Sequence, residues 1–364
     1  MKEIKALFFI NSFVGGGAER VCLNLAKSLH EMNISSDFVT VYDIKADYDV
    51  PDYIRIFSLN VKGSASFVRT FLEVLKGISR VNRFILGDEY VLVTAHLQPS
   101  GFLASLSRIG KKCLYVIHGS QHLKDKHSSR IYKMALQLAL KGKRTVTVSK
   151  GLKHELIYEY GIKPEKITVI YNPCIVSIRT DESRVPTLDK RPYILVMGRL
   201  EEEKNPLLAL ELYYKGKFYN KYDLIYLGKG SLEDRLKRNI TDYRLENYVF
   251  VEGFQKDSRS WLMSASLLLS CSKQEGFGLN LAEALIYGIP VVAVDCPYGP
   301  KEILTGRLSE YLINPEQNFE GSISTISSAL ESYPEITSKY YKRFDAAIII
   351  RKYLRVWKKY FGGK

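Results

Sequence analysis

Residues 272–290, SKQEGFGLNLAEALIYGIP, decide the fold of this chain, because they carry it from a buried strand through a glycine turn into a helix. The preceding segment, residues 261–271, ends in an apolar run that predicts the buried strand. Leu279 to Tyr287 has apolar residues at helical spacing, and Gly288 marks the end of that helix. A strand, a glycine turn and a helix form an anion site, because unpaired N–H groups and the positive end of the helix dipole meet there.

Two glutamates flank this turn: Glu275 lies before it, and Glu283 lies about one helical turn after it. Both carboxylates can accept hydrogen bonds from the hydroxyls of one ligand, such as a sugar on one side and a ribose on the other. A phosphate of that ligand would face the backbone N–H groups of Gly276, Phe277, Gly278 and Leu279. The alternative is that Glu283 only complements the helix dipole and that Glu275 is solvated.

Length and composition indicate a globular protein with room for two domains: the chain has 364 residues, 46% hydrophobic and 25% charged. No apolar run approaches the roughly 18 residues of a membrane span, and the apolar run at 6–10 is too short for a signal peptide, so we expect a cytoplasmic protein. The five cysteines are odd in number and far apart, which favours reduced core thiols over disulfides or a CxxC metal site.

The net charge of +14 is concentrated in the first half of the chain. Residues 1–180 carry 26 Lys and Arg against 15 Asp and Glu, whereas residues 181–364 carry 27 against 24. Two basic segments, residues 62–84 and 124–153, favour contact with a membrane surface or a lipid-linked phosphate; solvated helix faces are the alternative. No nucleic-acid-binding motif accompanies the charge, so no nucleic acid is expected as a partner.

Strands and helices alternate in two sets, which is typical of parallel sheets covered by helices. The first set has predicted strands at residues 4–10, 39–42, 54–59, 90–94, 112–117, 144–148 and 167–170. The second set has predicted strands at residues 193–197, 222–227, 248–251, 265–270 and 291–294. Residues 173–192 have the composition of a linker, and residues 338–360 predict one long amphipathic helix.

Several turns after these strands suit a ligand. Residues 11–20, NSFVGGGAER, lack the last glycine of the dinucleotide pattern G-x-G-x-x-G, but their three glycines let a ligand approach the backbone. Arg199 and Lys204 could clamp a diphosphate, or they could form a surface ion network with the glutamates at 201–203. The turns at 227–231 and 252–255 could border a nucleobase, although simple turns explain them about as well.

Together these segments resemble a retaining nucleotide-sugar glycosyltransferase of the GT-B fold, family 4 (glycosyl transferases group 1). The matching parts follow the family's order over most of the chain: GGAER at 16–20, VTVSKG at 146–151, ITVIYNP at 167–173, Gly198-Arg199 with Lys204-Asn205, residues 275–283, and DCPYGPKEI at 295–303. The resemblance implies an α/β fold of two doubly wound Rossmann-like domains facing across a cleft. Residues 1–180 would bind the acceptor, residues 181–340 would bind the nucleotide-sugar, and the amphipathic helix at 341–364 would return to the first domain.

The resemblance also assigns roles to single residues. It implies catalytic roles for His118, Glu275, Arg199 and Lys204. It implies donor contacts for Gly16, Gly17, Arg199, Lys204, Phe254, Glu275, Gly276, Phe277, Gly278, Leu279 and Glu283. Within this set Glu283 would bind the ribose, Glu275 would hold hydroxyls of the donor sugar, and His118 would lie beside that sugar. Without the family, His118 would be interpreted as a satisfied histidine at a strand end.

Metal chemistry is not expected, and neither is a cofactor. His118 and His122 lack the glutamate of a zinc-binding HExxH helix. Asp47 and Asp49 form an Asp-x-Asp motif, but they lie far along the chain from the donor motifs. The resemblance therefore implies a transferase that works without a divalent ion.

The implied reaction moves a sugar, with retention of its anomeric configuration, from a UDP-sugar to a lipid-linked oligosaccharide or lipopolysaccharide acceptor. Such a reaction belongs to bacterial surface polysaccharide synthesis. The basic first half of the chain then predicts peripheral contact with the anionic inner face of the cell membrane. Two alternatives remain: a GT-B sugar-nucleotide epimerase, and a non-catalytic glycan- or nucleotide-binding partner of a polysaccharide synthase.

Overall fold

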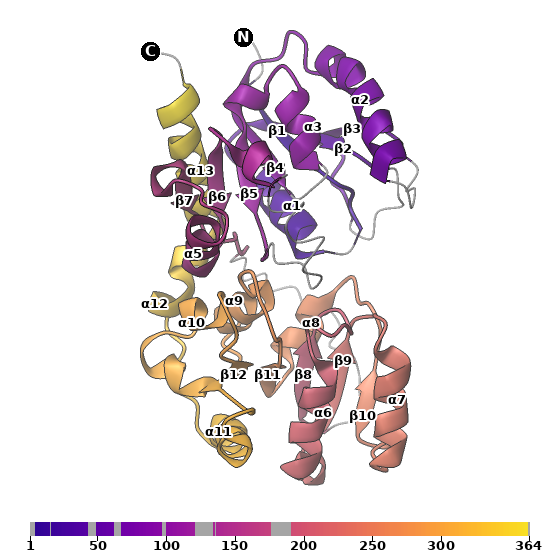
Figure 1. The fold of residues 1–364 in the computed structure, drawn as a ribbon. Coiled ribbons are helices and arrows are strands. Elements are labelled where there is room, and N and C mark those ends of the chain that lie inside the picture. Colours follow the sequence, from indigo (N-terminus) through magenta and orange to yellow (C-terminus); the bar gives the residue numbers. More distant parts are fainter. Residues whose placement is uncertain are drawn as a thin grey trace. The chain divides into compact units, whose positions relative to one another are not determined.

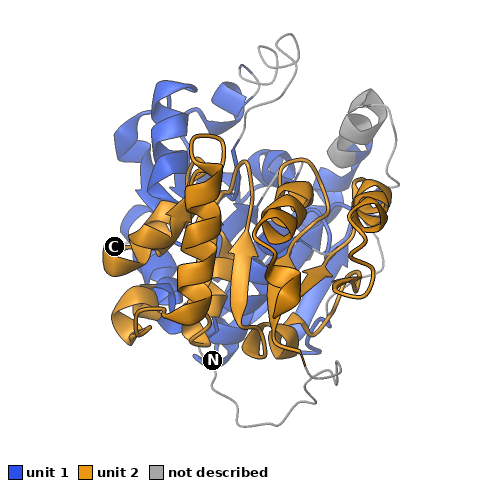
Figure 2. Ribbon diagram, turned by 90° about the horizontal axis from the view of Figure 1, so that it is seen from below, with its two compact units in different colours: residues 1–175, 344–364 blue, residues 176–343 orange. Residues whose placement is uncertain are grey.

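The computed structural model describes residues 4–14, 16–42, 49–61, 67–96, 100–120, 134, 136–175 and 191–362. Its chain divides into two compact units (Figure 2), hereafter unit 1, residues 1–175 with 344–364, and unit 2, residues 176–343. Asp47, His122, most of the predicted linker and part of each basic segment lie outside the described residues. Within the described ranges, no helix is both long and apolar enough to cross a membrane.

Unit 1 is built on a sheet with the strand order β3-β2-β1-β4-β5-β6-β7, in which neighbouring strands run parallel (Figure 1). The strands are β1 Lys5–Ile10, β2 Ser35–Thr40, β3 Ile54–Ser58, β4 Tyr90–His96, β5 Leu114–Ile117, β6 Arg144–Thr147 and β7 Ile167–Val169. The helices are α1 Gly17–His30, α2 Phe67–Phe84, α3 Ser100–Leu106, η1 Gly110–Lys112, α5 Lys150–Tyr158, η2 Pro164–Lys166 and α13 Ala346–Phe361. Five consecutive residues of β1 are buried, as expected for a strand covered on both faces.

Unit 2 has its own sheet, with the order β10-β9-β8-β11-β12-β13 and parallel pairs throughout. The strands are β8 Tyr193–Met197, β9 Asp223–Leu227, β10 Val249–Val251, β11 Leu267–Ser270, β12 Val291–Val294 and β13 Leu312–Ile313. Its longer helices are α6 Pro206–Lys215, α7 Glu233–Asp242, α8 Ser258–Met263, α9 Leu279–Ile286 and α11 Phe319–Glu331. Shorter ones are η3 Phe218–Asn220, α10 Pro300–Ile303, η4 Gly306–Tyr311, α12 Ser338–Tyr341 and η5 Lys342–Phe344.

Both sheets reverse their strand order once, between β1 and β4 in unit 1 and between β8 and β11 in unit 2. The predicted fold class, two doubly wound Rossmann-like α/β domains, is thereby confirmed. In such sheets a ligand binds beyond the carboxyl ends of the strands at the point of reversal. The segments that follow β1, β4, β8 and β11 are therefore where a site is expected.

The second strand of unit 1 differs from the prediction. β2 covers Ser35–Thr40, whereas the sequence predicted a strand at residues 39–42. Its first half is polar, yet Ser36 and Asp37 are both only 2% exposed, because Asp37 is paired inside an ion network. Val41 and Tyr42 instead donate backbone hydrogen bonds to Asn11 at the end of β1. A polar strand with internal charge partners does not show the apolar pattern that sequence reasoning relies on.

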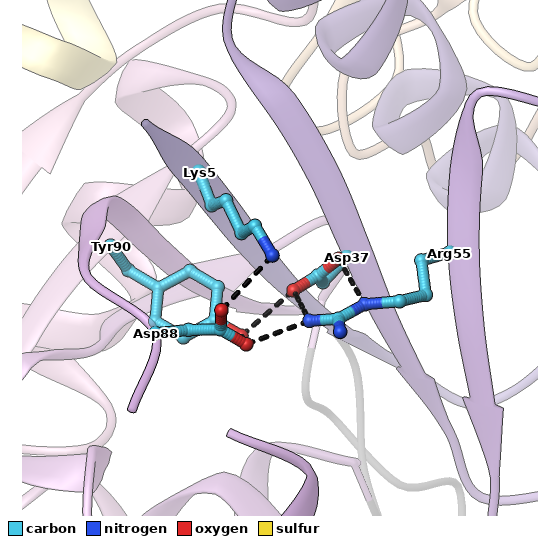
Figure 3. A network of polar contacts seen from close by, with 5 residues as sticks. All are labelled: Lys5, Asp37, Arg55, Asp88 and Tyr90. Atoms are coloured by element: carbon cyan, nitrogen blue, oxygen red, sulfur yellow. Dashed lines mark hydrogen bonds and ion pairs between the residues drawn. The ribbon is translucent and has the colours of Figure 1, made fainter. Parts of the chain in front are cut away.

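That ion network joins the amino ends of four strands of unit 1 (Figure 3). Arg55 donates to Asp37 at 2.9 Å and to Asp88 at 2.8 Å. Lys5 contacts Asp88 at 3.0 Å, and the Tyr90 hydroxyl donates to Asp37 at 2.8 Å. Burial raises the pKa of Asp88, but the hydrogen bonds from Arg55 and Lys5 outweigh it, so the pKa is lowered and the carboxylate stays charged. The network fixes the sheet at the edge opposite its carboxyl ends.

The single helix predicted over residues 338–360 is wrong. α12 and η5 end before Asp345, and α13 begins after it as a separate helix. The chain is extended at the break because the Cys174 N–H donates to Phe344 O at 2.8 Å and the Ala346 N–H donates to Cys174 O at 3.0 Å. The Asp345 side chain then caps α13 by accepting hydrogen bonds from two backbone N–H groups of its first turn.

Helix α13 completes the core of unit 1. It packs on β4 and α1, and its buried face consists of Ala346, Ile349, Ile350, Tyr353 and Trp357. The Trp357 indole N–H donates to Lys112 O at 2.7 Å, which ties the helix to η1. The last helix of the chain therefore belongs to the same unit as its first strand.

Candidate functional site

The glycine turn after β11 has the geometry of a helix-start anion site. Gly278 is the N-cap of α9 and adopts a left-handed conformation with φ of 90°, which favours glycine. A Cβ there would also lie 2.9 Å from a methyl carbon of Leu281. Gly278 has no side chain to cap α9, and Asn280 Oδ1 instead accepts the Leu281 N–H at 3.0 Å. A glycine turn that leads into a helix start is the arrangement that holds a phosphate.

Glu275 lies just before the turn and is paired with Lys204. The Lys204 ammonium forms an ion pair with Glu275 Oε1, and the Ser272 hydroxyl donates to the same oxygen at 2.9 Å. Glu275 is 8% exposed, so the alternative of a solvated carboxylate does not hold. Burying a charge is costly unless it is paired, and Lys204 and Ser272 supply that pairing. The two residues lie 71 positions apart in the sequence and meet at the carboxyl edge of the sheet.

Arg199 takes a different partner from Lys204. Its guanidinium pairs with Glu203, and the Arg199 side chain is 63% exposed. An exposed pair of this kind contributes little, about 0–1 kcal/mol, so the guanidinium can exchange Glu203 for another anion. Of the surface ion network considered from the sequence, the Arg199–Glu203 pair forms. Glu201 instead accepts a hydrogen bond from Ser231, Glu202 pairs with Lys273, and Lys204 pairs with Glu275.

The ends of β8 and β11 and the loops that follow them line one pocket. It is lined by Met197, Gly198, Arg199, Lys204, Ser270, Cys271 and Ser272, with apolar residues of β8 and β11 beneath. Asn280 Nδ2 donates to Met197 O at 3.1 Å, which holds the first turn of α9 against the end of β8. The Lys273 N–H donates to Glu203 O at 2.8 Å, which joins the two loops. The pocket therefore has a fixed wall of backbone and a cationic rim.

Close backbone packing accounts for two glycines near the pocket. A Cβ on Gly299 would lie 1.9 Å from Phe277 O, so residues 295–299 pack directly on the glycine turn. The Glu275 N–H donates to Pro297 O at 3.4 Å in the same contact. A Cβ on Gly228 would lie 1.9 Å from Gly198 O, so the turns after β8 and β9 are equally close.

The remaining predicted residues of unit 2 lie on the same edge of its sheet. Glu283 is in α9, five residues after Gly278, and is 6% exposed. Phe254 follows Gly253 after β10 and is 38% exposed, which leaves one side of its ring accessible. The structure thus brings Lys204, Glu275 and the start of α9 together, with Arg199 at the rim.

In unit 1 the predicted residues follow the carboxyl ends of β1 and β5. Gly16 is the extended N-cap of α1, and Gly17 is its first residue, where a Cβ would meet nothing within 4 Å. His118 follows β5, and its Nε2 lies 2.7 Å from Nδ1 of His96. Burial lowers the pKa of His118 to about 4, so this imidazole is neutral at pH 7.

Three residues that touch the site had no role in the sequence prediction: Ser272, Asn280 and His96. A polar Asn280 in an otherwise apolar helix start was the available signal for one of them. His96 was missed because the predicted strand ended at residue 94, whereas β4 continues to residue 96. The His96 side chain therefore lies at the end of β4, where the strand order reverses.

These features define the class of protein. A glycine turn with a helix start, a Lys–Glu pair and two doubly wound sheets are the parts of a GT-B glycosyltransferase. The model of Glycosyltransferase Family 4 matches residues 15–176, and the model of Glycosyl transferases group 1 matches residues 178–347. The chain belongs to the group 1 glycosyltransferases.

Known proteins support this membership. An N-acetylgalactosaminyltransferase of Campylobacter jejuni, whose name gives N-acetylgalactosamine-N,N'-diacetylbacillosaminyl-diphospho-undecaprenol as its acceptor, is 26% identical over 95% of this chain and 97% of its own. A lipopolysaccharide 1,6-galactosyltransferase of Salmonella typhimurium is 28% identical over 56% of this chain and 60% of its own. The fold is similar to that of S. aureus TarM, crystallised with UDP, with a TM-score of 0.73 and 15% identity over 98% of this chain and 100% of TarM.

Gly299→Ala is expected to lower the stability of unit 2 by about 1–3 kcal/mol, because the added methyl group must displace the carbonyl of Phe277. Thermal unfolding of the purified variant measures the loss. Lys301→Ala is the matched control, because its side chain lies on the same loop and is 58% exposed; we expect a change within about 0.5 kcal/mol. Equal unfolding temperatures for Gly299→Ala and the wild type would contradict the close packing.

Proposed function

We propose that this protein is a retaining glycosyltransferase that moves a sugar from a UDP-sugar to a lipid-linked oligosaccharide or lipopolysaccharide acceptor. The observation that carries the proposal is the ion pair between the partly exposed Lys204 and the buried Glu275, which lies just before the glycine turn and α9. A cation paired with an anion, next to the start of a helix, suits a ligand that has both phosphates and hydroxyls. A nucleotide-sugar has both.

In this proposal unit 2 binds the donor. The N–H groups of residues 276–279 hold the diphosphate with Arg199 and Lys204, and Glu283 accepts hydrogen bonds from the ribose. Phe254 borders the base. The side-chain cations supply the positive charge that a leaving diphosphate requires, so the proposed reaction needs no divalent ion.

The ion pair gives Glu275 two states. Without donor, Lys204 neutralises the carboxylate, so the buried site carries no unpaired charge. When a diphosphate arrives, Lys204 turns to it, and Glu275 keeps Ser272 while its other lone pairs accept hydroxyls of the sugar. Donor binding thus gives Lys204 the diphosphate as its charged partner in place of Glu275.

The chemical step breaks the bond between the anomeric carbon and the diphosphate oxygen. The acceptor oxygen then bonds to that carbon on the same face, and its proton passes to the leaving diphosphate. Arg199, Lys204 and the start of α9 stabilise the charge that develops on the leaving group. The proposal also assigns roles to three residues of unit 1: Gly16 and Gly17 as donor contacts, and His118 as a catalytic residue.

Support for the acceptor class comes from the relatives, whose names give lipid-linked and lipopolysaccharide acceptors. Unit 1 carries the excess of basic residues, and large apolar side chains are exposed near them: Leu138 is 68% exposed and Tyr158 is 76% exposed. These two residues lie on neighbouring segments, since Gln137 Nε2 donates to Tyr160 O at 2.8 Å. We therefore propose peripheral contact between unit 1 and the inner face of the cell membrane.

A panel of UDP-, GDP- and dTDP-sugars tests the donor assignment. We expect one UDP-sugar to raise the unfolding temperature and to be hydrolysed slowly to UDP and free sugar, with no loss of rate in EDTA. Lys204→Ala is expected to abolish the shift, and Lys237→Ala, on exposed helix α7, is the control. Binding without any turnover would favour the non-catalytic partner, and a changed sugar still bound to UDP would favour the epimerase. A shift from none of the sugars would overturn the proposal.

Kinetic and binding measurements distinguish the proposed roles of Glu275 and Glu283. Glu275→Gln is expected to lower kcat at least about tenfold with a small change in donor affinity, because its contacts strengthen on the sugar in the transition state. Glu283→Gln is expected to raise the donor Kd about tenfold or more, the effect of weakening hydrogen bonds to a charged group. Steady-state kinetics and calorimetry measure both. Small and equal effects would mean that both carboxylates are structural.

Membrane contact is tested by sedimentation with anionic liposomes. We expect the protein to pellet with them at low salt and to be released at about 0.5 M salt, because screening removes most of the attraction. Leu138→Glu should weaken pelleting. Met263→Glu, at a residue of unit 2 that is 48% exposed at the end of α8, is the matched control. A protein that stays in the supernatant at low salt does not bind such membranes.

A further inference from the structure

His96 is fully buried at the carboxyl end of β4, directly beside His118. β4 and β5 are paired with Thr94 opposite Leu114 and His96 opposite Val116, so the two histidines leave neighbouring strands at the same edge. Their rings stack, with centroids 5.0 Å apart and planes inclined by 26°. The backbone of His96 is also held, because the Ser100 hydroxyl at the start of α3 donates to its carbonyl. This histidine therefore has one fixed position.

Three polar groups form a chain: Thr94 Oγ1 lies 2.9 Å from His96 Nε2, and His96 Nδ1 lies 2.7 Å from His118 Nε2. Burial lowers the pKa of both histidines, that of His118 to about 4, so each ring is neutral at pH 7 and carries one proton. In each contact one atom must donate and the other must accept. The hydrogen bonds from Thr94 through His96 to His118 can then all point in only one of two directions.

The Thr94 hydroxyl selects between these directions. Thr94 is completely buried, and His96 is its only side-chain hydrogen-bond partner in the described part of the chain. Each direction leaves one donor without an acceptor among the described residues: the Thr94 O–H if His96 donates to Thr94, and the His118 Nδ1–H if Thr94 donates to His96. Thr94 is enclosed in the sheet, whereas the His118 side chain is partly exposed, so a ligand can supply the missing acceptor only to His118. Thr94 is therefore the donor, His96 accepts at Nε2 and donates from Nδ1, and His118 accepts at Nε2.

We propose that His96 is a positioning residue that fixes His118 as the tautomer protonated on Nδ1. His118 Nδ1 is buried and has no hydrogen-bond partner among the described residues, so its N–H is left to donate to an oxygen of a bound ligand. The proposal rests on the proposed function, in which that oxygen belongs to the donor sugar or the acceptor hydroxyl. A pre-oriented N–H donor needs no rearrangement when the ligand arrives.

The tautomer can be measured without substrate, by ¹H–¹⁵N correlation spectra of the histidine rings in the full-length wild type, with His118→Ala for assignment. We expect a protonated Nδ1 and a bare Nε2 on His118. Thr94→Val removes the first donor and should give a mixture of tautomers, whereas Thr94→Ser should keep the wild-type pattern. A His118 ring protonated on Nε2 in the wild type overturns the proposal, whatever the activity.

The role in turnover is tested by a double-mutant cycle. His96→Leu is expected to lower turnover about 5- to 150-fold, the effect of losing one hydrogen bond in a buried site, and to have no further effect in a His118→Ala background. His96→Asn can place a donor amide where Nδ1 stood and should restore most of the rate. Additive losses would show that His96 acts independently of His118 and would overturn the proposal. A fully active His118→Ala would instead remove His118 from the proposed function and leave the tautomer result intact.

Discussion

Parallel strands that are buried on both faces must all end at one edge of their sheet, and both units depend on this constraint. Strand interiors such as that of β1 are largely apolar, so many polar side chains gather at the strand ends and in the segments that follow them. At the edge of unit 2, Lys204 meets Glu275 across 71 residues of sequence. At the edge of unit 1, His96 meets His118 across 22 residues. At both carboxyl edges, residues that are distant in the sequence thus bring their polar atoms together beyond the strands.

In each unit a neighbouring side chain holds a polar group: Glu275 in unit 2 and His118 in unit 1. Glu275 is neutralised by one lysine and held by one serine, so it is available without being solvated. The His118 ring is desolvated and neutral, and we propose that the adjacent His96 fixes which of its nitrogens carries the proton. In both cases a group with a proposed ligand role is held by a neighbouring side chain, Ser272 for Glu275 and His96 for His118. Such positioning lowers the reorganisation that binding would otherwise require.

The sequence predicted the fold class and most strands, because apolar runs such as that of β1 report burial directly. It predicted the glycine turn and the helix start as well, since glycine, a strand and a helix are local signals. β2 was misplaced because Asp37 is paired with residues far along the chain. The break at Asp345 and the partner of His118 were missed for the same reason: each depends on a long-range hydrogen bond that no periodicity reports.

Unit 1 is formed by two segments of the chain, residues 1–175 and 344–364, and this has a consequence for biosynthesis. Residues 176–343 are a topological insertion, and their two junctions are joined by the hydrogen bonds between Cys174 and the chain at Phe344 and Ala346. Ile349, Ile350 and Tyr353 of α13 are fully buried in unit 1 and are synthesised after unit 2. Unit 2 can therefore fold on the ribosome while the first unit still lacks part of its core, which reverses the usual order in which domains fold from the N-terminus.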